Sequence, residues 1–206
     1  MKHFYKYTSL NFIESAIKYG AYASRLDRIN DPYECEGILY PNDFRVSCLT
    51  KSSSQMLMWS YYNNHRGCVL KYAFPDDIYG VLLKPVAYSN IYVAHRFLSD
   101  EEIIDSLYKK GREWKKENEV RAVYHAKKHD ATAWNHVDEE VYLKARVETV
   151  YLGILSHKDS KYQDAIHFIK EYNQENSESI NVKKYILSDR GYKLVLDTQF
   201  DYNREV

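Results

Sequence analysis

The chain has 206 residues, with 29 basic and 29 acidic side chains and a formal net charge of zero. This length fits one domain whose interior is large enough to fold without metals or disulfides. Zero net charge excludes a general electrostatic attraction to nucleic acid or to a membrane surface. The three cysteines are an odd number and include no CxxC pair, so we expect no disulfide framework and a reducing compartment.

The N-terminus lacks the apolar core of a signal peptide, and no apolar run reaches the roughly 18 residues that span a membrane. We therefore expect a cytoplasmic protein without membrane contact, folded as a single domain over residues 1–206.

Strand patterns recur as short runs of aromatic and β-branched residues between turn residues. They predict strands in residues 3–8, 44–50, 68–74, 81–94, 117–125, 139–153, 182–187 and 192–197. The last two are joined by the segment SDRG, where Gly191 suits the positive φ of a tight hairpin.

Capping patterns predict helices between these strands. The pairs Asn11 with Glu14, Ser52 with Gln55, and Ser99 with Glu102 have the spacing of capping boxes. The expected helices cover residues 11–18, 53–65, 99–114 and 160–172, and residues 24–37 form an ordered loop with a turn at Asn30 and Asp31. The fold class is α+β, with mixed, mostly antiparallel sheets and several helices.

The segment WKKENEVR, residues 114–121, is the main candidate site. On a strand, Glu117, Glu119 and Arg121 share one face, because side chains alternate. That face could be solvated, as charged strand faces often are. It could instead form buried ion pairs that lock the loop over 24–37 against the helix over 53–65, or form a functional site. In the ion-pair alternative, Glu117, Glu119 and Arg121 would pair with Arg25, Arg66 or Asp31.

The sequence lacks the motifs of the common nucleotide-binding and metal sites. There is no P-loop, GxGxxG or HExxH motif, and seven glycines provide no glycine-rich phosphate cradle. His65 and Cys68 are the one loose pair of metal ligands, so we expect no metal site. The 21 tyrosines, and the stripe of Met58, Tyr62 and His65 on the second expected helix, suit either a core or a stacking pocket.

Four segments resemble the bacterial family known as domain of unknown function 2971. They are YKYTS at 5–9, RINDPYEC at 28–35, SCLTKSSSQMLMWSYYNNHRGCVLKY at 47–72 and WKKENEVRAVY at 114–124. The likeness covers residues 5–124 in order, and the C-terminal third carries no motif of the family. The family name implies no function.

The order of elements also resembles the ADP-ribosyltransferase fold, in particular the DarT-like branch that modifies DNA. Lys6, Tyr7 and Thr8 fall at the first motif, where Lys6 stands in place of a histidine. Residues 56–58 fall at the second motif, and Glu119 falls at the third. The resemblance implies an ADP-ribosyltransferase-like fold and NAD as substrate.

Cleavage of NAD between ribose and nicotinamide develops a positive charge that a carboxylate can stabilise. Glu119 is the expected catalytic carboxylate, and Glu117 would orient the acceptor or act as its base. Arg121 would grip the pyrophosphate or balance the two glutamates. The other expected cofactor-binding residues are Lys6, Tyr7, Thr8, Ser47, Trp59 and Tyr62.

The acceptor of ADP-ribose could be nucleic acid, protein or a small molecule. The DarT-like resemblance and the stacking tyrosines favour nucleic acid and imply a toxin or phage-defence role. The alternative is a noncatalytic domain that senses a nucleotide or binds a protein.

Overall fold

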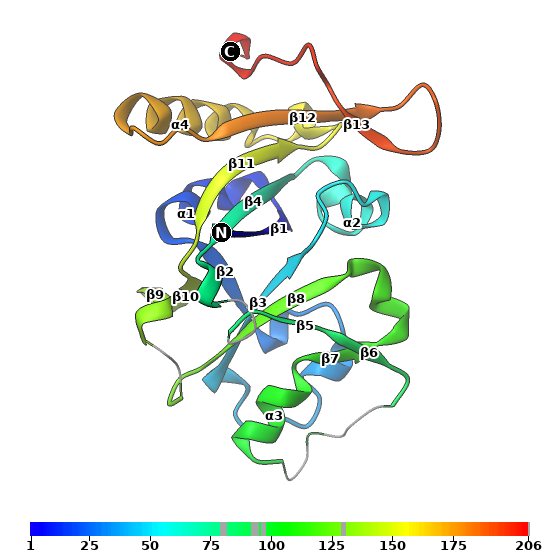
Figure 1. Ribbon diagram of the computed structural model, residues 1–206, viewed down its shortest axis with the longest axis vertical. Helices are drawn as coiled ribbons and strands as arrows, with labels where there is room; N and C mark the ends of the chain where they lie inside the picture. The colour runs from blue at the N-terminus through cyan, green and yellow to red at the C-terminus, as the bar shows by residue number, and fades with distance from the viewer. Residues whose placement is uncertain (79–81, 92–94, 96–97, 129–130, 206) are drawn as a thin grey trace. The chain divides into compact units, whose positions relative to one another are not determined.

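The computed structural model describes residues 1–78, 82–91, 95, 98–128 and 131–205 (Figure 1). Its mostly antiparallel strand pairs and several helices confirm the mixed α+β class. The chain divides into two compact units. Unit 1 comprises Met1–Lys2, Tyr19–Lys51 and Phe74–Lys144, and unit 2 comprises His3–Lys18, Ser52–Ala73 and Ala145–Val206. The expectation of one domain over residues 1–206 stays a prediction.

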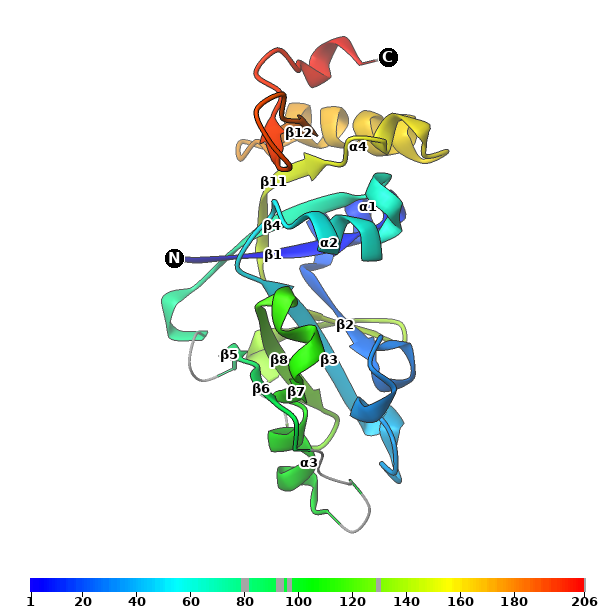
Figure 2. The same ribbon diagram turned by 90° about the vertical axis from the view of Figure 1, so that its right-hand side faces the viewer.

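Unit 1 contains an antiparallel sheet in the order β5-β8-β3-β2-β10-β9. Its strands are β2 (Ala21–Arg25), β3 (Phe44–Thr50), β5 (Lys84–Pro85), β8 (Glu119–His125), β9 (Trp134–Val137) and β10 (Glu140–Leu143). A separate parallel pair joins β6 (Ala87–Ser89) to β7 (Lys109–Gly111), and helix α3 (Asp100–Ser106) precedes β7. Figure 2 shows β3 and β8 side by side, as in Figure 1.

The core of unit 1 packs against β3. It is formed by apolar side chains from the loop after β2, from β3 and from α3, namely Leu26, Ile38, Phe44, Val46, Ile103 and Leu107. Strand β8 pairs with β3 along its whole length and with β5 at Val120 and Arg121.

Unit 2 contains a sheet in the order β13-β12-β11-β4-β1. Its strands are β1 (Lys2–Thr8), β4 (Cys68–Phe74), β11 (Arg146–Leu152), β12 (Asn181–Leu187) and β13 (Leu194–Leu196), and its helices are α1 (Ile13–Tyr19), α2 (Met56–Tyr61) and α4 (Tyr162–Glu175). Helix α4 connects the parallel strands β11 and β12. It buries residues 162, 165, 166 and 169, the spacing of one helical face.

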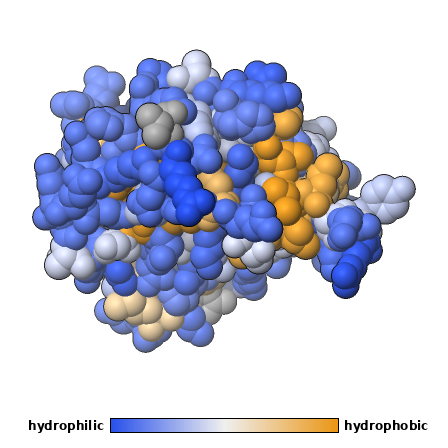
Figure 3. Space-filling view, turned by 90° about the horizontal axis from the view of Figure 1, so that it is seen from above, coloured by the Kyte–Doolittle hydropathy of each residue, from blue (hydrophilic) through white to orange (hydrophobic). Residues whose placement is uncertain are grey.

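The hairpin of β12 and β13 carries exposed apolar side chains. The exposed residues are Ile186, Leu187 and Leu196. A hydrophobic patch appears on the right of Figure 3, the side on which β13 lies in Figure 1. The hairpin end of this sheet therefore leaves apolar surface uncovered by the rest of unit 2.

Several expected elements need correction, and others are confirmed. The Ser99 capping box is present, but the helix ends at Ser106 rather than near 114. The Ser52 capping box is wrong, because helix α2 begins at Met56 after Gln55, whose side chain makes no capping hydrogen bond. The strand over 139–153 is two strands, and β2 was not expected. The final hairpin is present, with φ of +148° at Gly191.

Part of the expected strand over 81–94 lies outside the described residues. No helix in the described ranges is long and apolar enough to cross a membrane.

Candidate functional site

The charged residues of WKKENEVR are buried in unit 1. Glu117 is 3% exposed, Glu119 is 6% exposed and Arg121 is fully enclosed. The explanation of a solvated strand face is therefore wrong. Strand β8 begins only at Glu119, while Glu117 ends a 3₁₀ helix, and Asn118 between them has a left-handed φ of 47°. Glu117 thus joins the other two through a turn rather than through strand alternation.

The guanidinium of Arg121 donates two hydrogen bonds to the carboxylate of Glu119. Its Nε donates to Oε1 at 2.8 Å and its Nη2 to Oε2 at 2.9 Å, while Nη1 donates to the carbonyl of Leu107 at 2.7 Å. This paired geometry is the strong form of an arginine–carboxylate contact. Burial alone would raise the pKa of Glu119, but Arg121 and Lys110 outweigh it and hold that pKa below its ordinary value.

Lys110 and Glu34 complete the cluster. Lys110 donates from Nζ to Glu117 Oε2 at 2.7 Å and lies 3.5 Å from Glu119 Oε2. Glu34, from the 3₁₀ helix Pro32–Glu34, places Oε1 2.5 Å from Arg121 Nη2. The predicted ion pairs are therefore present with different partners: Glu34 and Lys110 rather than Arg25, Arg66 and Asp31.

The cluster holds one more acid than base, because three carboxyl groups face two cations. Burying an uncompensated charge is costly, so such a cluster tends to retain a proton. Burial raises the pKa of Glu34 to about 7, against the opposing pull of Arg121 and Lys110. Burial also raises the pKa of Glu117. Glu34 is thus a buried carboxyl group that titrates near neutral pH.

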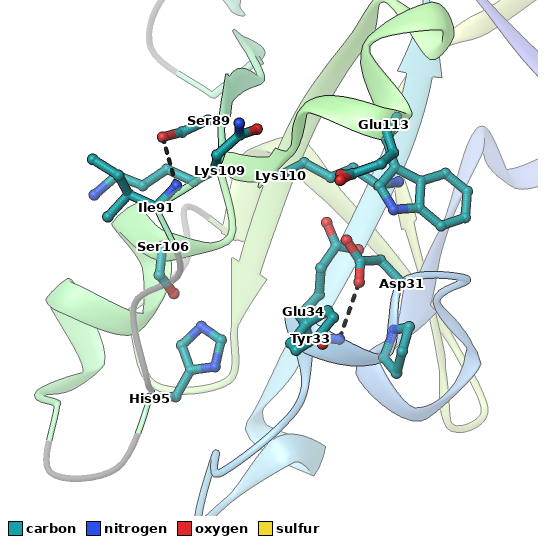
Figure 4. A pocket seen from close by; sticks show the side chains of 14 residues that line it. Asp31, Tyr33, Glu34, Ser89, Ile91, His95, Ser106, Lys109, Lys110 and Glu113 are labelled. Carbon is teal, nitrogen blue, oxygen red and sulfur yellow. Dashed lines mark hydrogen bonds between the residues drawn. The ribbon is translucent and has the colours of Figure 1, made fainter.

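A cavity of about 740 Å³ in unit 1 opens onto this cluster (Figure 4). Glu34 and Lys110 belong to both the cavity wall and the cluster. The described lining residues are Asp31, Pro32, Tyr33, Glu34, Ser89, Asn90, Ile91, His95, Ser106, Lys109, Lys110, Gly111, Glu113 and Trp114. Cavities of this size accommodate small-molecule ligands.

The loop over 24–37 supplies one wall of the cavity. Asp31 caps the 3₁₀ helix Pro32–Glu34, since its Oδ1 accepts a hydrogen bond from the Tyr33 N–H at 3.0 Å. The predicted turn at Asp31 is therefore confirmed, and the same cap sets the backbone from which Glu34 projects. The carboxylate of Glu34 is held by the Arg121 guanidinium.

The opposite wall comes from β7 and the 3₁₀ helix Arg112–Glu117. Lys110 Nζ lies 4.5 Å from the centroid of the Trp114 ring, a cation–π arrangement. The same ammonium group holds Glu117, so the aromatic wall and the ion cluster are tied together by one side chain.

The expected site residues fall into two groups. Ser47, Glu117, Glu119 and Arg121 lie in unit 1, and Lys6, Tyr7, Thr8, Trp59 and Tyr62 lie in unit 2. Ser47 is fully enclosed, and its Oγ donates to the carbonyl of Ala21 at 3.4 Å. In the unit 1 group, the structure brings Glu117, Glu119 and Arg121 into one cluster.

Trp59 and Tyr7 are core residues of unit 2. Trp59 is fully enclosed and donates from Nε1 to the carbonyl of Ser53 at 2.9 Å. Tyr7 packs edge-on against it, with ring centroids 5.3 Å apart, and Tyr62 packs on the same cluster. Helix α2 ends at Tyr61, so Tyr62 and His65 lie beyond it and the expected helical stripe is not formed, although Met58 and Tyr62 do pack in this core. The role of Trp59, Tyr7 and Tyr62 in binding NAD stays a prediction.

Sequence reasoning missed Glu34, Lys110 and Trp114 as a connected group. The sequence places Glu117 and Glu119 beside a single arginine, Arg121. If both glutamates are buried, a second cation is needed to balance their charge, and this was the signal that could have led to Lys110. No pattern singled out Lys110 among the many lysines of the chain. Among the described residues, no group of three side chains is placed to hold a metal ion.

No family model, curated protein or solved structure matches this chain.

Proposed function

We propose that the cavity of unit 1 binds a nucleotide and that NAD is its ligand, cleaved by a protein with an ADP-ribosyltransferase-like fold. The observation that supports this proposal is the cavity itself, whose wall combines aromatic rings with a buried, partly compensated ion cluster. Tyr33 and Trp114 provide faces for a planar ring. Lys109 provides a positive charge for a phosphate group.

The proposed reaction needs a carboxylate at the ribose. Glu119 has this role in the resemblance, yet it is not among the described residues of the cavity wall, and Arg121 occupies both of its oxygens. For Glu119 to act on NAD, with Glu117 assisting the acceptor, the guanidinium must release it when the ligand binds. The acceptor proposed with this reaction is nucleic acid, in a toxin or phage-defence role.

A second candidate function is favoured because Arg121 occupies both oxygens of Glu119. In a noncatalytic nucleotide-sensing domain, the ion cluster would shape the cavity and hold the loop of Glu34 without entering any reaction. Replacing such a cluster by neutral side chains changes stability and binding but no chemical step.

Two measurements on the same samples separate the candidates. NAD binding is followed by calorimetry, and free nicotinamide is measured after incubation with and without single-stranded DNA, RNA or a bacterial lysate. The proteins are the wild type, Glu119→Gln, and the control Glu101→Gln, whose carboxylate lies on the surface beside Lys128. Nicotinamide release that is lost only in Glu119→Gln supports the transferase.

Binding of NAD without release under any of these conditions favours the sensor. Absence of NAD binding by the wild type contradicts both candidates as far as NAD is concerned.

A further inference from the structure

We infer that strand β13 is a dimerisation edge, at which two copies of the chain join their unit 2 sheets by antiparallel pairing. The inference concerns unit 2 alone and goes beyond the proposed function, which rests on the cavity of unit 1. It is drawn from the place of β13 in the sheet, from the direction of its backbone groups and from the order of charges over residues 193–197.

The first observation is that β13 is an edge strand. It ends the strand order of the unit 2 sheet, and its neighbour among the described residues is β12. The carbonyl of Lys193 accepts a hydrogen bond at 3.0 Å and the N–H of Asp197 donates one at 2.9 Å, both to backbone groups on the β12 arm of the hairpin.

This pattern fixes which backbone groups face outward. Backbone groups alternate in direction along a strand, so those of Val195 point towards β12, like those of Lys193 and Asp197. Those of Leu194 and Leu196 point away from β12, and no backbone hydrogen bond outside the β12 pairing engages them within the described chain. A row of outward N–H and C=O groups is a template for a further strand.

The second observation is the order of charges in the segment KLVLD, residues 193–197. Lys193 and Asp197 stand at equal distances on either side of Val195 and share its face of the strand. In an antiparallel pair with a two-fold axis at Val195, Lys193 of each copy lies directly opposite Asp197 of the other. Opposite charges in this position stabilise a pair of strands. A parallel pair in register would oppose like charges, so the charges select the antiparallel arrangement.

The same axis also satisfies the outward backbone groups. Leu194 of one copy faces Leu196 of the other, and each such pair exchanges both of its N–H···O bonds. Val195 faces its own counterpart in a pair without hydrogen bonds, as its inward-pointing groups require. A register shifted by one residue would set outward groups of one copy against inward groups of the other. Charge and hydrogen bonding therefore select the same register.

The third observation is the apolar surface around this edge, which lies in the patch on the right of Figure 3. Leu187 is 63% exposed and Leu196 is 38% exposed. In the paired sheets, one row of side chains would run from Leu187 and Leu194 of one copy to Leu196 and Tyr185 of the other. Pairing thus covers apolar surface that unit 2 leaves open. The edge is short, so we expect a weak, reversible dimer that a two-fold axis closes against further growth.

The test measures self-association of the whole chain by sedimentation velocity over an about hundredfold range of concentration. The wild type should pass from monomer to dimer without larger species. Lys193→Glu and Asp197→Lys each oppose like charges at both ends of the paired strands, so each should weaken the dimer by about tenfold or more. Lys183→Glu is the control, because it makes the same change of net charge at an exposed position of the internal strand β12 and should associate like the wild type.

Mixing the two weakened variants provides the sharpest readout. When Lys193→Glu pairs with Asp197→Lys, every charge across the axis again faces an opposite one. An equimolar mixture should therefore recover about the dimer affinity of the wild type, which a merely misfolded variant could not do.

A cross-linking measurement keeps the inference testable if a charge variant fails to fold. Across the axis, the two copies of residue 195 have Cα atoms about 4.5 Å apart, within the range of a disulfide. Val195→Cys should therefore give a covalent dimer under mild oxidation. Thr198→Cys is the control at an exposed position, since its two copies would lie about 20 Å apart. Both variants keep the three native cysteines, so the wild type gives the background.

A wild type that stays monomeric over the whole concentration range would overturn the inference. So would a dimer that neither charge variant weakens, or cross-linking as fast at residue 198 as at residue 195. Failure of the mixture to associate, together with no cross-link in Val195→Cys, would overturn it as well. None of these results bears on NAD binding, so the inference and the proposed function fail separately.

Discussion

Glu34 Oε1 lies 2.5 Å from Nη2 of Arg121, and this ion pair joins the 3₁₀ helix Pro32–Glu34 to strand β8. The guanidinium also donates to both oxygens of Glu119 and to the Leu107 carbonyl. Glu34 therefore shares the Arg121 guanidinium with a second carboxylate. Burial outweighs this attraction and raises the pKa of Glu34 to about 7, so Glu34 takes up a proton more readily than an exposed glutamate does.

Removal of Arg121 should destabilise the protein strongly. Arg121→Met leaves three buried carboxyl groups with Lys110 as their cation, and breaking a buried pair in this way costs about 3–5 kcal/mol. Urea unfolding near pH 7 measures the change. Arg190→Met is the matched control, because that side chain is exposed, and it should change stability by less than about 0.5 kcal/mol. A loss under about 1 kcal/mol for Arg121→Met would contradict the account of the cluster.

The stability contributed by Glu34 should depend on pH. Its folded-state pKa is raised from 4.5 to about 7 by burial, so the folded protein holds the proton more tightly than the unfolded chain. The free energy of unfolding of the wild type, relative to Glu34→Gln, should therefore fall as the pH rises from about 4.5 to about 7. The expected total is on the order of 3 kcal/mol.

Unfolding curves for both proteins at steps across this pH window give the difference directly. Above about pH 7 the difference should level off, with Glu34→Gln at least as stable as the wild type. A difference that is constant with pH, or that rises, would show that Glu34 has an ordinary pKa.

Lys110 and Glu117 should be energetically coupled. Lys110→Met leaves Glu117 buried without its ammonium partner, and Glu117→Gln removes that charge again. The double variant should therefore recover about 1–3 kcal/mol of the loss seen in Lys110→Met. Denaturant unfolding of the wild type, both single variants and the double variant provides the cycle. Simple additivity of the two single changes would show that the pair does not interact.

Trp59 and Trp114 should respond differently to truncation. Trp59→Ala removes a fully enclosed ring from the core of unit 2, which costs about 3–5 kcal/mol. Trp114→Ala removes a half-buried ring from the cavity wall, so it should cost less stability and weaken NAD binding. Thermal unfolding and calorimetric titration of NAD distinguish the two effects. Weaker binding in a folded Trp59→Ala variant, with normal binding in Trp114→Ala, would instead support the site predicted from the sequence.

The sequence predicts much of the local structure because local signals control it. The Ser99 capping box, the turn at Asp31 and the hairpin at Gly191 each depend on one or two residues, and each is present. The predicted strand began too early, because it included Glu117. The chain turns at the left-handed residue Asn118, and β8 begins only at Glu119. No rule based on alternation shows such a turn at a non-glycine residue.

The candidate site was predictable only in part. The pattern around Glu119 correctly brought Glu117 and Arg121 together, but the partners Glu34 and Lys110 are set by the tertiary structure. Trp59 and Tyr7 look like stacking residues in the sequence, since an aromatic stripe fits a core and a pocket equally well. Their burial is decided by the packing of β12 and β13, whose residues Tyr185 and Leu194 lie in the same cluster.

The most direct test of the central claim is a crystal structure of the protein grown with NAD. The account predicts ligand density in the cavity of unit 1, in contact with Lys109 and Trp114 of its wall. Density for NAD at another place on the chain would contradict it.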